Sequence, residues 1–329
     1  MTKQIPRLAW GVISTLVLFV ACSRDVPAND TESDARADLR LIVISHGQSS
    51  DPFWSVVANG VQDAAADLGV RVEYQAPTSF DMVRMSQLID AAVVSRPSAL
   101  IASVPDPVAL GESLRAAVAA GIPVLGINAG ADAWESLGLI GYLGQTEYEA
   151  GHGAGERLAA AGARQVLCVN HEVGNASLDE RCRGLDDAVS AAGGRASVLA
   201  VDLADPDDAQ QRIASTITND RAISGMLALG PAGAVPALAA LRSSGRTGEI
   251  QFGTFDLGPE VLRAVVDGDI AFAIDQQPYL QGYLAVVLMT KYVEAGIMPG
   301  GGQLIRTGPS FVTAANAADV MRLTEQGIR

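Results

Sequence analysis

The strongest constraint on the fold of this chain is a regular alternation of two kinds of segment. Short apolar runs of strand length are each followed by a longer stretch with the apolar spacing of an amphipathic helix, and glycine or proline separates them. Strands are predicted at residues 40–46, 71–75, 99–104, 123–128, 139–143, 165–170, 196–201, 225–229, 250–255 and 270–275. Helices are predicted at residues 52–68, 82–95, 108–120, 146–161, 178–191, 209–218, 232–243, 259–266 and 279–295.

Such an alternation predicts an α/β fold, in which parallel strands are covered by helices on both faces. The predicted strands are too many for one ordinary open sheet, and they exceed the eight of a (β/α)8 barrel, the competing architecture. The length of 329 residues suits two domains. We therefore expect two doubly wound parallel-sheet lobes.

Composition and charge exclude several classes of function. The net charge of -14 and the absence of a basic patch argue against nucleic-acid binding and against attachment to anionic lipid. The only lysines are Lys3 and Lys291, so no phosphate-binding GxxxxGK[ST] loop exists. The sequence also lacks GxSxG, a well-placed GxGxxG and metal-ligand spacing, which disfavours a hydrolase or dehydrogenase and predicts no metal, cofactor or catalytic residue.

The N-terminus has the features of an export signal. Residues 1–22 combine Lys3 and Arg7 with an apolar core too short for a comfortable membrane span. Phe19-Val20-Ala21-Cys22 resembles a lipoprotein cleavage box, which predicts lipidation of Cys22. A simple cleaved signal or an uncleaved anchor are the alternatives. The polar, acidic residues 23–38 predict a flexible tether.

Two further cysteines lie in neighbouring predicted elements. Cys168 is in a strand, and Cys182 lies about two turns into the helix that follows. If their side chains face each other they form a disulfide, which an exported protein can keep. Two separately buried thiols are the alternative.

Polar and aromatic residues gather just after the predicted strands. In a doubly wound sheet, ligands bind beyond the carboxyl ends of the strands. The side chains there are mostly amides, carboxylates and aromatic rings, with few pairs of nucleophile and base. They indicate a site that hydrogen-bonds a neutral polyhydroxylated molecule.

Six motifs in order along the chain resemble those of a known family. They are LIVISHGQSSDPFW, IASVPDP, GIPVLGINAG, EVGNASLDERCRG, FGTFDLGPEV and AFAIDQQPYLQG. With these motifs, from about Leu39 to Phe311, the chain resembles the type I periplasmic binding proteins, specifically the ribose-binding-like sugar receptors of bacterial ABC importers.

The resemblance implies a sugar or polyol held in a cleft between two lobes, which close about a three-strand hinge. It implies an N-terminal lobe of residues 39–143 plus 278–302 and a C-terminal lobe of residues 144–277 plus 303–329, with crossings near residues 143–145, 276–278 and 300–303. It also implies a monomer outside the cytoplasm, held to the membrane only by its lipid, that delivers its ligand to an ABC permease. The alternative is a ligand-sensing receptor of the same fold that signals to a sensor kinase or chemoreceptor.

The resemblance also implies roles for individual residues. Phe53 and Trp54 match rings that stack on a sugar. The hydrogen-bonding positions are Asp51, Ser103, Asn128, Arg181, Asp256 and Gln276. Asn128-Ala129 stands where an Asp-Arg pair is common and Gly230 where an Asn is usual, so the cleft loses donors and gains room for a hexose, a sugar alcohol or a ligand with another substituent.

Four more residues are candidates because of where they lie. His46 and His171 follow predicted strands, where each either contacts ligand or caps the strand end. Asn175 lies in the same strand-end segment as His171, and Trp134 is a candidate wall of the cleft. The glycines of Gly151–Gly155 lie within a helical pattern and predict close helix packing rather than a dinucleotide loop.

Overall fold

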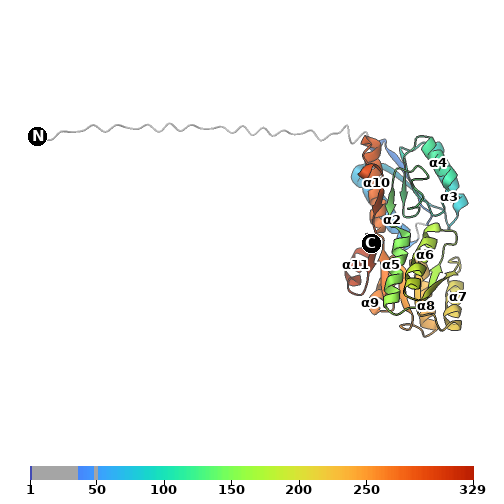
Figure 1. Cartoon of the computed structure of the whole chain (residues 1–329). Coiled ribbons are helices and arrows are strands. Elements are labelled where there is room, and N and C mark those ends of the chain that lie inside the picture. Colours follow the sequence, from blue (N-terminus) through green and yellow to red (C-terminus); the bar gives the residue numbers. More distant parts are fainter. Residues whose placement is uncertain (2–35, 48–50) are drawn as a thin grey trace.

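A computed structural model describes Met1, residues 36–47 and residues 51–329 (Figure 1). The predicted signal peptide, Cys22 and residues 23–35 of the predicted tether lie outside the described residues. The prediction that the tether extends to residue 38 is wrong, because Arg36 forms an ion pair with Glu294 on the body of the protein. No helix in the described part of the chain is both long and apolar enough to cross a membrane.

The first lobe is built on a six-stranded sheet in the order β11-β5-β4-β3-β1-β2. All its pairings are parallel. Its strands are β1 (Arg40–Ile44), β2 (Arg71–Gln75), β3 (Ala99–Ser103), β4 (Val124–Ile127), β5 (Tyr142–Gly144) and β11 (Leu304–Arg306). Its helices are α2 (Pro52–Leu68), α3 (Met82–Ser95), α4 (Gly111–Ala119) and α10 (Pro278–Ala295), with the short turn η1 (Pro299–Gly301).

The second lobe repeats the plan with the order β12-β10-β9-β8-β6-β7. Only β12 is antiparallel to its neighbour within this described sheet. Its strands are β6 (Gln165–Asn170), β7 (Arg195–Ala200), β8 (Gly225–Ala228), β9 (Gln251–Phe255), β10 (Phe272–Asp275) and β12 (Ser310–Val312). Its helices are α5 (Glu147–Ala160), α6 (Ala176–Ala191), α7 (Pro206–Asn219), α8 (Pro231–Ser243), α9 (Pro259–Asp267) and α11 (Ala317–Thr324).

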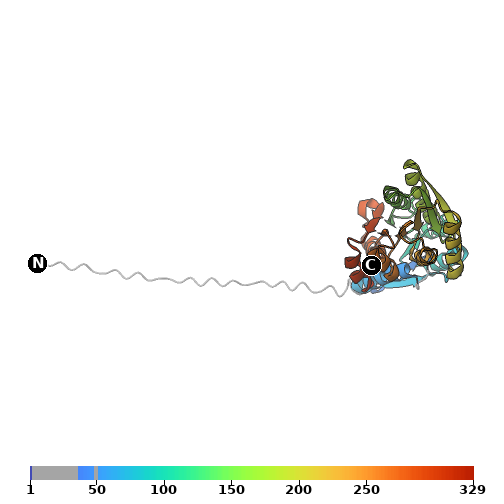
Figure 2. The ribbon, with the colours of Figure 1, turned by 90° about the horizontal axis from the view of Figure 1, so that it is seen from below.

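Alternate side chains of a strand point to opposite faces of the sheet. Helices cover both faces of each sheet. In β1, Leu41 and Val43 pack with α2 and α10, whereas Ile42 and Ile44 pack with α3 and α4. The second sheet is likewise covered by α5 and α6 on one face and by α7, α8, α9 and α11 on the other. Figure 2 shows this lobe end-on, with helices on both sides of its strands. The predicted fold class is confirmed.

The described chain crosses between the lobes three times. The first crossing follows β5, the second lies between β10 and α10, and the third lies between β11 and β12. The third was predicted near residues 300–303, which is wrong: Leu304–Arg306 pairs with β5 and so belongs to the first lobe. The lobe boundary at residue 302 therefore moves beyond Arg306.

Glycines bring one pair of helices together in each lobe. A Cβ at Gly60 of α2 would lie 2.2 Å from the carbonyl oxygen of Tyr279 in α10. A Cβ at Gly151 of α5 would lie 2.0 Å from the carbonyl oxygen of Arg181 in α6. The prediction that the glycines near residue 151 permit close helix packing is confirmed.

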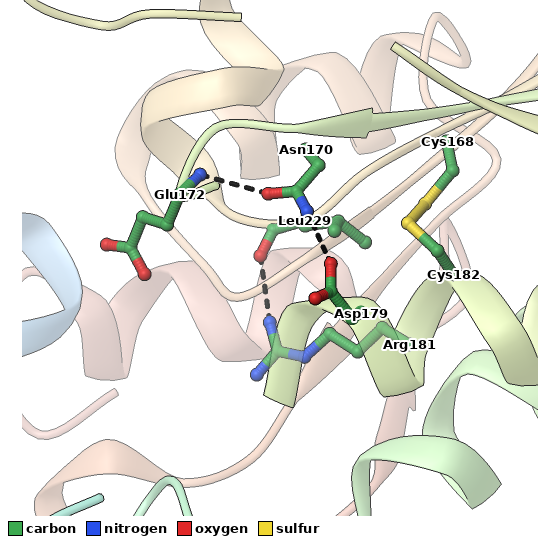
Figure 3. Close-up of a disulfide and its surroundings, with 7 residues drawn as sticks. All are labelled: Cys168, Asn170, Glu172, Asp179, Arg181, Cys182 and Leu229. Atoms are coloured by element: carbon green, nitrogen blue, oxygen red, sulfur yellow. Dashed lines mark hydrogen bonds between the residues drawn. A yellow bond between two sulfur atoms is a disulfide. The ribbon is translucent and has the colours of Figure 1, made fainter. Parts of the chain in front are cut away.

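A disulfide joins Cys168 of β6 to Cys182 of α6, with 5.8 Å between the Cα atoms (Figure 3). The predicted pairing is confirmed. The bond ties the first turns of α6 to the sheet, one residue away from Arg181.

Candidate functional site

Two adjacent cavities lie between the lobes, where the strands of both sheets end. The outer cavity has a volume of about 630 Å³ and the inner one about 40 Å³. Side chains of both lobes line both of them. The residues common to the two are His46, Asp51, Trp54, His171 and Glu172.

The first lobe supplies an aromatic wall at the start of α2. Asp51 caps the helix, and its carboxylate accepts hydrogen bonds from the backbone N–H of Phe53 at 2.8 Å and of Trp54 at 3.4 Å. The Trp54 ring meets the rings of Phe53 and His46 edge to face, with centroids 5.1 and 4.8 Å apart. Both aromatic side chains are core residues that also line the inner cavity, so the core holds the wall in place.

His46 is a buried, uncharged member of this wall. Its backbone N–H donates to Ser103 Oγ at 3.0 Å, and its Nδ1 lies 2.9 Å from the same oxygen. Burial, followed by the nearby charge of Arg181, lowers the pKa of His46 to about 3. His46 is therefore neutral at pH 7, with Nε2 directed toward Glu172 of the other lobe at 3.7 Å.

The second lobe supplies Arg181, whose guanidinium is fully engaged by its own lobe. It donates to Glu147 through Nε at 2.6 Å and Nη2 at 3.1 Å. It also donates through Nη1 to the carbonyl of Leu229 at 2.8 Å (Figure 3). Its Cζ also lies 4.1 Å above the centre of the Phe255 ring. This framework fixes Arg181 at the inner cavity.

Three polar side chains join the lobes at the hinge. Gln276 donates to Asp256 Oδ1 at 2.8 Å and accepts from Asn128 Nδ2 at 3.1 Å. Asn128 ends a first-lobe strand, Asp256 ends a second-lobe strand, and Gln276 lies in the crossing between them. Burial raises the pKa of Asp256 to about 7, although Arg181 opposes the shift.

A family model described as the periplasmic binding protein domain matches residues 42–297 of this chain. The chain belongs to this family. As a periplasmic binding protein it is a solute-binding protein, and the predicted resemblance is confirmed.

Two solved structures and one curated protein show the range of similarity. A carbohydrate transporter from Acidothermus cellulolyticus in complex with myo-inositol is 35% identical, with a TM-score of 0.83 over 88% of this chain and 99% of that chain. The xylose/arabinose-binding protein XylF of Sulfolobus acidocaldarius is 28% identical over 295 residues, 84% of this chain and 71% of that protein. An ABC transporter solute-binding protein from Burkholderia graminis in complex with D-arabinose has a TM-score of 0.78 at 22% identity, over 85% and 97% of the two chains, and supports the fold alone.

Most of the predicted site residues of this periplasmic binding protein come together at the inner cavity. The residues that line it include His46, Asp51, Phe53, Trp54, Asn128, His171, Arg181, Gly230, Asp256 and Gln276. Gly230 leaves room for a neighbour, since a Cβ there would lie 3.0 Å from Cε1 of His171.

Three predicted site residues face elsewhere. Ser103 lies behind His46 and holds its ring. Asn175 caps α6 and donates to Glu172 at 2.7 Å. Trp134 packs against the first-lobe core beside α3 and α4 instead of walling the cleft. Ser103 and Asn175 are thus positioning residues in this structure.

Glu172 is a cavity residue that the sequence analysis missed. It lines both cavities, and burial raises its pKa to about 7. Phe80 and Asp202, which line the outer cavity, were missed too. All three follow predicted strands, so their position places them near the sheet edges, but it does not show that their side chains face the cavity.

Proposed function

We propose that this protein captures a sugar or cyclic polyol in the cleft between its lobes and delivers it to an ABC permease. The hydrogen-bonded chain of Asn128, Gln276 and Asp256 carries the proposal, because it brings one polar side chain from each lobe and one from the hinge to the same cavity. Each can exchange its present partner for a ligand hydroxyl. The Trp54 and Phe53 rings offer an apolar surface to the C–H face of a sugar ring.

The similarity to the Acidothermus protein supports a cyclic polyol as the ligand class, since that structure contains myo-inositol. The inner cavity of about 40 Å³ has room for a few water molecules only. We therefore expect the lobes to separate at the hinge to admit the ring and to close over it, so that ligand shifts an equilibrium between two conformations.

Delivery to a permease fits a body tethered outside the cytoplasm by a lipid on Cys22. A Cys22→Ser variant tests the anchor. Cells fed a labelled fatty acid should incorporate the label into the original protein and not into the variant, and label in the variant, or none in the original, would contradict lipidation of Cys22.

A binding screen tests the proposed ligand class. We expect at least one of myo-inositol, scyllo-inositol, D-xylose, L-arabinose, D-arabinose or D-glucose to bind by calorimetry and to raise the melting temperature. A ligand at a hundred times its Kd stabilises the folded state by about 2.7 kcal/mol. Asp256→Asn should weaken the hit about tenfold or more, since a hydrogen bond to a charged group contributes about 1.5–3 kcal/mol. Gln276→Ala should weaken it about threefold or more, since a hydrogen bond between neutral groups contributes about 0.5–1.5 kcal/mol.

Asp267→Asn, at an exposed carboxylate of the same lobe, is the matched control. If the folded protein binds none of the neutral sugars, polyols or their amino derivatives, the proposal is wrong.

A further inference from the structure

The cleft carries an excess of negative charge. Asp51, Glu172 and Asp256 line the inner cavity, and Asp51, Glu172 and Asp202 line the outer one. Among the described lining residues the only lysine or arginine is Arg181, at the inner cavity. Residues 48–50, which adjoin Asp51 in sequence, are Gln, Ser and Ser and add no charge.

Arg181 offsets these carboxylates only in part. Its guanidinium makes a two-point ion pair with Glu147, which lies within the second lobe and has a side chain only 4% exposed. The positive charge is therefore already matched before any ligand enters. The two histidines of the cleft add no positive charge at pH 7, because burial lowers the pKa of His46 to about 3 and that of His171 to about 4.

The three inner carboxylates have neutral partners in the described chain. Asp51 accepts from backbone N–H groups, Glu172 from the Asn175 amide, and Asp256 from the Gln276 amide. Burying a carboxylate without a cation is costly, and for each of them burial is the main cause of a raised pKa. A ligand that brings its own positive charge would relieve this cost.

Aromatic rings border the same carboxylates. Trp54 lies beside Asp51, and its ring meets the His46 ring, which also meets Phe80 edge to face at 5.9 Å. The electron-rich faces of such rings attract cations. Carboxylates and aromatic faces together match an ammonium group better than another hydroxyl.

From these charges we infer a narrower ligand class, and this inference rests on the proposed function. The cleft selects an amino sugar or aminocyclitol over the corresponding all-hydroxyl compound, with the ammonium group held between Asp51 and Glu172 beside the Trp54 ring. The ring hydroxyls then occupy the Asn128, Gln276 and Asp256 positions.

Paired ligands test this inference by calorimetry on the purified protein at pH 7. The pairs are D-glucose with D-glucosamine, and myo-inositol with a monoamino-monodeoxyinositol; N-acetyl-D-glucosamine provides a neutral nitrogen. We expect the amine of at least one pair to bind about tenfold tighter or more than its hydroxyl partner, since charge-assisted hydrogen bonds are about twice as strong as neutral ones. The N-acetyl compound should lose this advantage.

Charge-removing variants test the location. In an Asp51→Asn/Glu172→Gln protein the ratio of the two Kd values should fall toward one; Asn still caps α2. Glu260→Gln, at an exposed position of α9, is the matched control and should keep the ratio.

The outcomes separate the two proposals. If the hydroxyl member of each pair binds as tightly as its amine, or if the double variant keeps the preference, this inference is overturned while the capture of polyols stands. If no member of either pair and none of the other sugars binds, the proposed function itself fails.

Discussion

At the scale of single residues, the hinge side chains occupy an uncommon backbone conformation. Asn128 and Asp256 have φ values of 62° and 61°, in the left-handed region that Asn and Asp tolerate better than most residues. Both end strands of parallel sheets, one in each lobe, and both reach Gln276. Residues held in such conformations concentrate at ligand clamps, where the surrounding structure maintains them.

The difference in stability between Asp256→Asn and the original protein should depend on pH, because only the original protein has the Asp256 carboxylate. The folded-state pKa is raised from 3.8 to about 7, so the folded form binds the extra proton between those values and loses stability relative to the unfolded form as pH rises. Asparagine cannot ionise and escapes this loss. The melting temperature of the variant minus that of the original, both ligand-free, should therefore increase from pH 4.5 to pH 7.5 and then level off.

Asp267→Asn serves as the control here too, and its difference should stay flat over that range. A difference for Asp256→Asn that also stays flat would show that this carboxylate is not buried as the structure has it.

Position in the sequence predicted which residues reach the cleft better than it predicted which way they face. Position after a predicted strand singled out His46, and the resemblance singled out Asn128 and Asp256; all three line the inner cavity, although their contact with ligand stays a prediction. Ser103, also implied by the resemblance, lies behind His46, because its small hydroxyl is hydrogen-bonded to that residue. Glu172 was missed because an acidic residue in a polar run gives no sign that the other lobe will bury it.

At the scale of elements, α6 is held to its surroundings on two sides, and both supports converge on Arg181. The disulfide ties α6 to β6, and the Asn170 amide donates to Asp179 on the same helix at 3.1 Å (Figure 3). On a second side, Gly151 of α5 allows the backbone of Arg181 to approach. Support of a binding side chain by its helix is what keeps its geometry fixed.

Removing the disulfide should cost stability. A cross-link over a sequence separation of 14 limits the unfolded chain and stabilises the folded protein by about 3 kcal/mol. Cys168→Ala/Cys182→Ala should therefore lower the free energy of unfolding in urea by about that amount. Dithiothreitol should destabilise the original protein similarly and leave the double variant unaffected. Identical urea midpoints with and without dithiothreitol for the original protein would contradict the bond.

Filling the contact between α5 and α6 should displace Arg181. Gly151→Ala places a Cβ against the Arg181 carbonyl, and we expect a loss of about 1–3 kcal/mol in unfolding free energy together with at least about tenfold weaker ligand binding. Gly153→Ala on the same helix is the control, since its Cβ would meet only the edge of the Phe311 ring at 3.3 Å. Equal behaviour of the two variants would refute the role of Gly151.

The longer elements were predicted closely because their apolar periodicity extends over several turns or residues. The helices Pro52–Leu68 and Met82–Ser95 have the predicted limits. In contrast, β11 and β12 have three residues each, too few to show an alternation, and both were missed. Their pairing is decided by distant strands, β5 and β10, which a local pattern does not reveal.

At the scale of the whole molecule, the end of the described chain contacts the second lobe beside the hinge and also reaches the first lobe. Arg329 pairs with the fully buried Asp275 at the hinge, at 2.7 Å. Two residues earlier, the carbonyl of Gly327 accepts from Asn59 of α2 at 3.2 Å. In Figure 1 this end of the chain lies at the level where the lobes meet, after α11 of the second lobe.

Arg329→Ala should therefore destabilise the protein through the hinge. It leaves the Asp275 carboxylate with the backbone N–H of Gln277 as a partner, and a buried acceptor left short of partners costs about 1–3 kcal/mol. Urea unfolding measures the loss. Arg322→Ala, which breaks an exposed pair with Asp319, should change stability by less than about 1 kcal/mol. A loss for Arg329→Ala no greater than that would argue against a stabilising role of the Arg329–Asp275 ion pair.

The interleaving of the lobes also sets the order in which the protein can be completed. Helix α10 and strand β11 belong to the first lobe but follow β10, so a chain that emerges with its N-terminus first presents α2 long before the helix that covers it. The apolar face of α2 therefore lacks α10 as its cover while nearly all of the second sheet is synthesised. The first lobe therefore stays incomplete until about the last sixth of the printed sequence is synthesised, which is compatible with passage through a secretion channel before folding.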